Sequence, residues 1–287
     1  MKKIFCYILG LSLTCWFSTT FSWNALGHMV VATIAYDHLQ PSVKTKVDQL
    51  VADFNKVYPE VKTFYQLAAW PDTLHGQKIE TYSHWHYTNL PFSDDGTPLK
   101  NVSPTDNVIW ALSLIKPVIQ NTKANKFERA RFLGFFAHFV GDIHQPLHTT
   151  SRISAELPNG DEGGNLFYIQ HPSLTTQSIS LHKYWDQGLG LLDVASSFYN
   201  ISLISNDISQ KFPEDFFGSR VLNFNFKSWG AEGFDLAQEY VYVTPPNQVP
   251  TSQYVKSGIG IIEQRLALAG YRLAAMLNII LANTYKS

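Results

Sequence analysis

Apolar residues recur at helical spacing along most of the chain, and the alternation typical of strands is scarce. The first such window runs from Leu26 to His38, and Ser42 can cap a second helix that runs to about Phe54. Further helices are predicted over residues 103–120, 127–144, 182–188, 194–211, 234–240 and 254–284. The pattern therefore predicts an all-α fold.

Two features interrupt the helical pattern. Residues 157–165 form a polar, glycine-rich loop, and the apolar alternation at Leu166–Ile169 predicts a strand or one arm of a small β-hairpin. The helix over 103–120 opens with Ser103 as its cap and Pro104 at its first position, whereas Pro146 ends or kinks the helix over 127–144. No linker separates two domains, so we expect one compact multi-helix domain.

The first 22 residues have the pattern of a cleaved secretory signal. Two lysines, Lys2 and Lys3, precede an apolar run from Ile4 to Phe17. The run is too short to predict a membrane span, and no later window holds about 18 unbroken apolar residues, so we expect no stable membrane anchor. A lipoprotein signal ending at Cys15 is the less favoured alternative. We expect removal of residues 1–22 and a secreted or periplasmic domain over residues 23–287.

The amino-acid composition further limits the classes of protein to which the chain can belong. With 45% hydrophobic and 16% charged residues, the chain can bury a sizeable core, which excludes disorder as its main state. Both cysteines, Cys6 and Cys15, lie in the signal, so the exported domain has no disulfide to stabilise it. Loss of Lys2 and Lys3 changes the net charge from −1 to −3, so charge alone predicts no strong nonspecific attraction to nucleic acid.

Two histidine–aspartate pairs give the first chemical signal. His138 and Asp142 lie four residues apart in one predicted helix, as do His182 and Asp186 in another, so each pair shares a helix face. An imidazole nitrogen and a carboxylate oxygen at this spacing suit a zinc ion in a helical bundle. A single pair of this kind is also an ordinary buried hydrogen bond, so one pair alone is weak support for a metal.

The segment from Ala137 to His148 is more informative, because it holds four side chains able to bind a metal and is otherwise apolar. Burying so many polar groups without partners would cost several kcal/mol, and metal coordination satisfies them. His144 lies about 200° around the helix from Asp142, which predicts a structural hydrogen bond rather than a metal bond. Pro146 can redirect His148 toward another part of the site.

Two other segments add candidate ligands. Pro71 fixes the turn before Asp72, and one of the histidines His84 and His86 should face inward if residues 83–87 are extended. Taken alone, Asp72 could be a helix cap and either histidine a solvated side chain. The spacing does not choose between the two histidines.

The amino terminus created by signal removal would begin at Trp23. A free α-amino group has a pKa of about 8, so a zinc ion can displace its proton at neutral pH. The Trp23 carbonyl oxygen would complete a five-membered chelate, and His28, about one helical turn further on, can join it. The terminus is therefore a candidate metal ligand.

These motifs resemble those of a known family in their order and spacing. They are Trp23–His28, Trp70–Asp72, Trp85–Tyr87, Gly141–His148, Glu162–Asn165, Leu181–Asp186 and Ala269–Ala275. Over the mature chain they resemble the zinc-dependent nucleases of the S1/P1 type, which are single-strand nucleases and 3′-nucleotidases. A more remote resemblance is to bacterial phosphatidylcholine phospholipase C.

The resemblance implies three zinc ions. By matching positions, the first is held by Asp72, His86, His138 and Asp142, the second by His148, His182 and Asp186, and the third by Trp23, His28 and Asp142. Trp23 would bind through its amino nitrogen and carbonyl oxygen, and Asp142 would bridge two ions. The resemblance selects His86 rather than His84.

The resemblance also implies the reaction and the substrates. The first and third ions, bridged by Asp142, would activate a shared water that Asp72 orients, and the second would stabilise the leaving 3′-oxygen. Cleavage of P–O3′ bonds in single-stranded DNA and RNA would give 5′-phosphorylated products, and 3′-nucleotides would also be substrates. No obligate protein partner is expected.

Four residues are candidates for substrate binding. Tyr87 would stack a base, and Asn89, where relatives have aspartate, would hydrogen-bond it. His75 stands where relatives often place Arg or Lys, so a phosphate contact there would strengthen at acidic pH. Asn165 ends the Glu162–Asn165 motif and completes the set.

Two other functions compete with this one. A phospholipase C has similar zinc chemistry, but that branch tends to carry glutamate at the last ligand, where this chain has Asp186. A noncatalytic binding protein would use zinc only to stabilise its fold, and closed tetrahedral sites would favour it. Measuring nucleotide release from single strands beside phosphocholine release from lecithin separates a nuclease from a phospholipase C.

Overall fold

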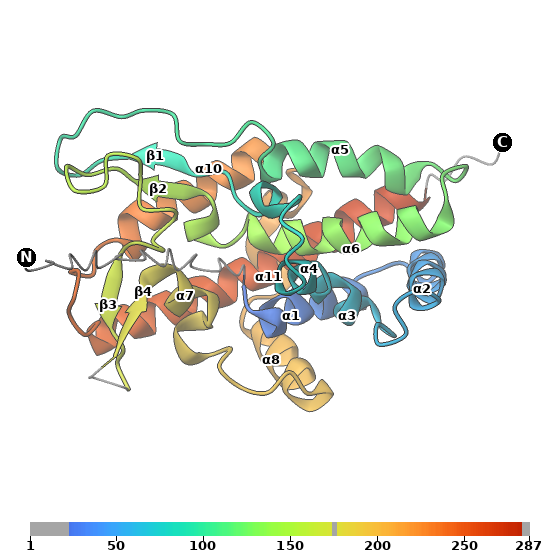
Figure 1. Ribbon diagram of the computed structural model, residues 1–287. Helices are drawn as coiled ribbons and strands as arrows, with labels where there is room; N and C mark the ends of the chain where they lie inside the picture. Colours follow the sequence, from blue (N-terminus) through green and yellow to red (C-terminus); the bar gives the residue numbers. More distant parts are fainter. Residues whose placement is uncertain (1–22, 174–176, 283–287) are drawn as a thin grey trace, which may run out of the picture.

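The computed structural model describes residues 23–173 and 177–282 (Figure 1). The predicted signal, residues 1–22, lies outside the described residues. The α-helices are α1 (Ala25–Asp37), α2 (Pro41–Asn55), α3 (Phe64–Ala69), α4 (Pro71–Gly76), α5 (Val108–Gln120), α6 (Lys126–Asp142), α7 (Leu181–Asp186), α8 (Phe198–Lys211), α9 (Glu214–Phe217), α10 (Phe226–Leu236) and α11 (Ser252–Ala282). Short helical turns are η1 (Ser83–His86), η2 (Pro146–His148), η3 (Gly188–Gly190), η4 (Gly218–Leu222) and the π-turn η5 (Ala237–Val241). The all-α prediction is confirmed.

The longest helix, α11, forms the centre of the fold. It crosses the molecule from the end that carries β3 and β4 to the end near α2 (Figure 1). α11 packs against α1, and α1 in turn contacts α3 and α8, while α6 packs against α5, α2 and α3. Among the described helices, α11 alone is long and apolar enough to cross a membrane, but 78% of its most apolar window is buried inside the fold. It therefore packs as a core helix.

Four short strands form two separate pairs. β1 (Leu90–Phe92) runs parallel to β2 (Thr150–Arg152), with Leu90 opposite Thr150. This pair ties the chain after η1 to the chain after η2. β3 (Tyr168–Gln170) and β4 (Ser178–Ser180) are antiparallel, which confirms the small hairpin expected near Leu166–Ile169.

Several helix boundaries differ from those that the sequence predicts. The helix predicted to begin at Ser103 begins at Val108, because the side-chain oxygen of Asn107 accepts hydrogen bonds from the amides of the first turn. In the same way Ser197 caps α8, which begins four residues after the expected start at Val194. The short helix expected over 234–240 is instead the end of α10 followed by the π-turn η5.

The end of α6 matters most for the site. α6 ends at Asp142 rather than at His144, and the His144 amide instead donates to the Gly141 carbonyl oxygen at 3.0 Å. Pro146 then opens the turn η2, which carries His148. Asp142 therefore lies on the last turn of α6, and His148 approaches it from a separate element.

The close contact of α1 with α11 generates a stability prediction. A Cβ atom at Gly270 would lie 2.5 Å from Cγ2 of Ile34, whereas a Cβ atom at Gly260 would meet nothing within 4 Å. Gly270→Ala should therefore destabilise the protein by about 1–3 kcal/mol through overpacking. Gly260→Ala in the same helix should stabilise it by about 0.5–1 kcal/mol, because alanine favours the helix. Urea denaturation checks both, and two shifts of the same sign would contradict the packing argument.

Candidate metal centre

The first group of metal-binding side chains comes from four elements. α1 contributes His28, α4 contributes Asp72, η1 contributes His86, and α6 contributes both His138 and Asp142. Nε2 of His138 lies 3.3 Å from Oδ1 of Asp72, and Nδ1 of the same ring is held by the Ala68 carbonyl oxygen at 2.8 Å. The i, i+4 spacing read from the sequence thus places His138 and Asp142 on one face, where the other elements meet them.

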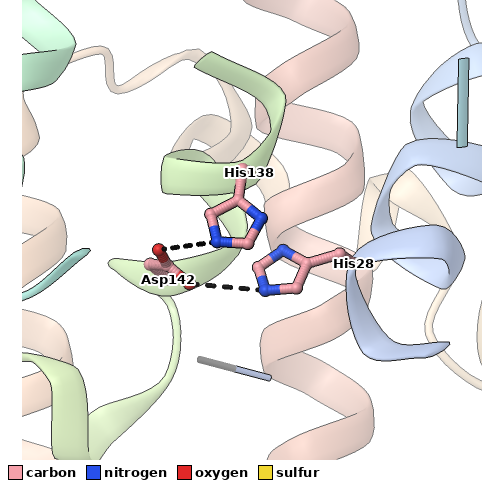
Figure 2. Close-up of side chains that lie close together, drawn as sticks. All are labelled: His28, His138 and Asp142. Carbon is pink, nitrogen blue, oxygen red and sulfur yellow. Dashed lines mark ion pairs between the residues drawn. The ribbon is translucent and has the colours of Figure 1, made fainter. Parts of the chain in front are cut away.

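The two carboxylate oxygens of Asp142 face different imidazoles. Oδ1 lies 3.4 Å from Nε2 of His28, and Oδ2 lies 3.4 Å from Nε2 of His138 (Figure 2). Oδ2 also lies 3.0 Å from Nδ1 of His86. The rings of His28 and His138 stack with their centroids 3.7 Å apart. One buried carboxylate is therefore shared between side chains of α1, η1 and α6.

A second group lies between η2 and α7. Nε2 of His182 lies 3.1 Å from Nε2 of His148 and 3.3 Å from Oδ2 of Asp186. The other ring nitrogens are fixed by backbone carbonyl oxygens, because Nδ1 of His148 contacts the His86 carbonyl at 2.8 Å and Nδ1 of His182 contacts the Gly163 carbonyl at 2.7 Å. All three side chains of the group are buried.

The ring orientations of the second group fit a bound cation. A carbonyl oxygen can only accept, so Nδ1 of His148 and of His182 carries the hydrogen and each Nε2 presents a lone pair. Two lone pairs that face each other at 3.1 Å repel unless a proton or a cation lies between them. Because burial lowers the pKa of His148, a metal ion suits this position better than a proton does.

The electrostatics of the two groups differ. Burial lowers the pKa of His28 to about 3, whereas for His138 the carboxylates Asp142 and Asp72 outweigh burial and raise the pKa to about 9. His138 in turn holds the pKa of Asp142 below its usual range despite burial. Burial instead raises the pKa of Asp186 well above its usual value. A cation in the second group would keep Asp186 ionised.

The start of the described chain lies against both groups. Trp23 is fully buried, and its Nε1 donates to the Gly141 carbonyl oxygen at 3.0 Å, one residue before Asp142. The backbone amide of Asn24 donates to the Asp186 carbonyl oxygen at 3.1 Å. The first two described residues are therefore held between the end of α6 and the end of α7.

Comparison with known proteins identifies the family. A model described as S1/P1 Nuclease matches residues 23–282. The chain belongs to the S1/P1 nuclease family. Endonuclease 1 of Arabidopsis thaliana is 24% identical over 302 residues, which cover 97% of this chain and 93% of the relative. Nuclease S1 of Aspergillus oryzae is 25% identical (91% and 92% covered), and Nuclease P1 of Penicillium citrinum is 23% identical (89% and 97% covered).

Family membership establishes the class of reaction. The chain is a zinc-dependent nuclease that hydrolyses phosphodiester bonds in nucleic acid. The clustered histidine and aspartate side chains of the two groups are consistent with that requirement for zinc.

Three residues predicted to bind substrate, Tyr87, Asn89 and His75, differ in their local surroundings. Tyr87 directly follows η1 and is half-buried, and burial raises the pKa of its phenol. Asn89 adopts a left-handed backbone conformation with φ 51°, which asparagine tolerates better than most residues. His75 lies at the surface, where Nδ1 contacts Oε2 of Glu80 at 2.9 Å.

Two further polar residues differ in burial: Asn165 is buried and His84 is exposed. Asn165 is buried and lines a cleft that also contains Asp72 and Asp186. His84, which the spacing could not separate from His86, faces away from the metal groups and contacts Oδ1 of Asp106 at 3.1 Å on the surface.

His144 makes the structural hydrogen bond that its helical angle predicts. Nδ1 contacts the Val140 carbonyl oxygen at 2.7 Å, and Nε2 lies 2.9 Å from a guanidinium nitrogen of Arg272. Burial keeps the pKa of His144 well below its usual value, so the neutral ring accepts from the arginine. Arg272 also pairs with Glu232, which links α10 and α11 behind the metal groups.

Gln145 and Gly163 hold the second group in place, although spacing in the sequence indicates no role for either. The Gln145 amide nitrogen donates to Oδ1 of Asp186 at 2.7 Å, while its oxygen accepts from the Leu147 amide. Gly163 has φ 65°, and a Cβ atom there would overlap the Leu147 carbonyl oxygen. A polar residue between two candidate ligands, in a segment that is otherwise apolar, was the available signal for Gln145.

Gln145 therefore allows a test of the second group. Gln145→Leu removes the hydrogen bond to Asp186 and should weaken zinc binding by about 10–100-fold, as losses of partners behind metal ligands do. Zinc titration against a competing chelator measures this. Gln238→Leu, at an exposed position of η5, is the matched control. Equal zinc affinity in the two variants would contradict the positioning role.

Proposed function

We propose that the chain is an exported nuclease that cleaves P–O3′ bonds of single-stranded DNA and RNA to 5′-nucleotides. We further propose that it hydrolyses 3′-nucleotides and uses three zinc ions. The observation that carries the proposal is the division of the Asp142 carboxylate between His28 on one oxygen and His138 and His86 on the other. That division fits a carboxylate that bridges two ions, beside a separate third site.

Nine residues would hold the ions. Asp72, His86, His138 and Asp142 would hold the first, His148, His182 and Asp186 the second, and Trp23, His28 and Asp142 the third. When bound, zinc supplies Lewis-acid charge that lowers the pKa of water and offsets negative charge on phosphate oxygens.

Asp72 and Asp142 would have distinct catalytic roles. Asp72 is less buried than Asp142 and faces the cleft, and His138 helps to keep its pKa below the usual value although burial opposes this. Ionised at neutral pH, Asp72 can accept a hydrogen bond from the attacking water and orient it toward phosphorus. The fully buried Asp142 keeps the two ligand sets at a fixed separation.

Substrate recognition would start at the first group. Tyr87 follows His86 directly, so a base stacked on its ring would lie close to the metal ligands. Such stacking would contribute about 1–3 kcal/mol of binding free energy per base. Asn89 would hydrogen-bond the base, with an amide that can both donate and accept. His75 and Asn165 would contact other parts of the nucleotide.

Export would complete the third site. Removal of residues 1–22 would leave Trp23 with a free amine, and the contacts of Trp23 with Gly141 and of Asn24 with Asp186 support a position beside the metal groups. We therefore propose a secreted or periplasmic enzyme, with no membrane anchor and no obligate partner, whose working domain spans residues 23–287.

Two asparagine substitutions test the proposed function. Asp142→Asn should lower bound zinc by two ions and activity on single-stranded oligonucleotides by at least about 100-fold, because it would remove a ligand from two proposed sites. Asp186→Asn should lower bound zinc by one ion. Zinc content per protein and the rate of nucleotide release are the measurements.

Asp235→Asn, at an exposed position of α10, is the matched control and should keep both properties. Equal zinc loss in the Asp142 and Asp186 variants would contradict the bridging role. Turnover of lecithin without turnover of oligonucleotides would instead favour a phospholipase, and full zinc content with no turnover of either would favour a binding protein.

The amino terminus has its own test. One alanine added before Trp23 keeps every side chain but moves the free amine, so the protein should lose one zinc ion and most of its activity. Intact mass verifies the added residue, and zinc content and oligonucleotide hydrolysis give the result. Proteolytic removal of the alanine should restore both. Full activity with the extra residue still in place would exclude the amine as a ligand.

A further inference from the structure

A cleft of about 520 Å³ leads away from the metal groups along α7 and the β3–β4 hairpin. Its inner wall contains Asp72, His182 and Asp186, and its outer wall contains Tyr168 and Lys183. The volume is within the range of small-ligand sites, about 300–1,000 Å³. Neither Tyr87 nor Asn89 lines it, so the cleft offers room for a part of the substrate that the first base does not occupy.

Lys183 supplies the cationic side chain of this cleft. It follows His182 in α7, but its side chain is exposed whereas that of His182 is buried. Among the described residues, no carboxylate forms an ion pair with Lys183, whereas Arg152 and Lys211 both pair with aspartates. Its ammonium group is therefore available to an anion that enters the cleft.

Tyr168 supplies an aromatic surface on the same wall. It lies on β3 directly opposite Ser180 of β4, which also lines the cleft, and it is 42% exposed while its neighbour Ile169 is fully buried. The hairpin and α7 lie together at one end of the molecule (Figure 1). An exposed ring and a lysine that line one cleft can together bind a single strand, because bases stack on the ring and the cation contacts the phosphate.

We propose that this cleft binds a second nucleotide of the single strand, with a phosphate on Lys183 and a base on Tyr168. The proposal rests on the proposed function and adds a site distinct from Tyr87. Since the cleft opens beside His182 and Asp186, the strand would continue past the second metal group toward the hairpin. The nuclease would then favour substrates of two or more nucleotides over minimal phosphodiesters.

The test compares a single-stranded oligonucleotide with bis(4-nitrophenyl) phosphate, which has one phosphate and no second nucleotide. Lys183→Ala should lower kcat/KM on the oligonucleotide about tenfold more than on the small diester, mainly through KM. The slope of log KM against log salt should fall by about 0.7, the value for one phosphate contact to a single strand. Lys183→Arg should recover most of the loss.

Substitutions of Tyr168 test the stacking surface, and two substitutions elsewhere on the surface serve as controls. Tyr168→Ala should lower oligonucleotide kcat/KM selectively, and Tyr168→Phe should keep it, because stacking needs only the ring. Lys256→Ala and Tyr199→Ala, both at exposed positions elsewhere, should match the unmodified enzyme. Equal losses on both substrates, an unchanged salt slope, or a Lys183→Arg variant as impaired as Lys183→Ala would overturn the second-nucleotide site. If the unmodified enzyme with ample zinc hydrolyses only the small diester, the proposed cleavage of single strands fails, and the second-nucleotide site fails with it.

Discussion

The structure depends on the burial of one carboxylate. Asp142 has no exposed surface, and an isolated buried carboxylate would cost far more than a folded domain can supply. Imidazoles from α1, η1 and α6 surround it, so the residues that compensate its charge are also those that draw three elements together. Because the buried anion is stable only with these imidazoles around it, its burial requires α1, η1 and α6 to pack together.

A layer of hydrogen bonds holds this arrangement in place. Backbone carbonyls fix the rings of His138, His148 and His182, and Gln145 fixes Asp186. Behind them, Glu232 lies between two buried arginines, which hold its pKa at about 2 although burial opposes this. These hydrogen bonds restrict the rotation of the metal-binding side chains, which lowers the cost of forming the site. In a domain without cysteine, this polar framework and the apolar core around α11 take the place of disulfides.

The charge distribution explains how a slightly acidic chain can act on a polyanion. Lysines and arginines such as Arg131, Arg152 and Lys211 pair with surface carboxylates, so they create little long-range field. Attraction of phosphate must then come from a local positive site, and a cluster of divalent ions within a cleft is such a site. Lys183 at the rim of that cleft extends the same local attraction outward.

The sequence by itself determined the helical fold and which polar side chains share a face of one helix. Helical spacing placed His138 with Asp142 and His182 with Asp186, and it turned His144 away from them, because positions within one helix are fixed by 3.6 residues per turn. The small hairpin followed from local alternation.

Only the tertiary structure decided how separate elements combine. Spacing alone could not choose His86 over His84, because the choice depends on how η1 packs against α6. It could not give roles to Gln145 and Gly163, whose partners Asp186 and His182 lie 41 and 19 residues away. It also misplaced the start of α5, where Asn107 competes with Ser103 as the cap. Sequence fixes which side chains share a face of one element, whereas packing of the whole chain fixes which faces meet.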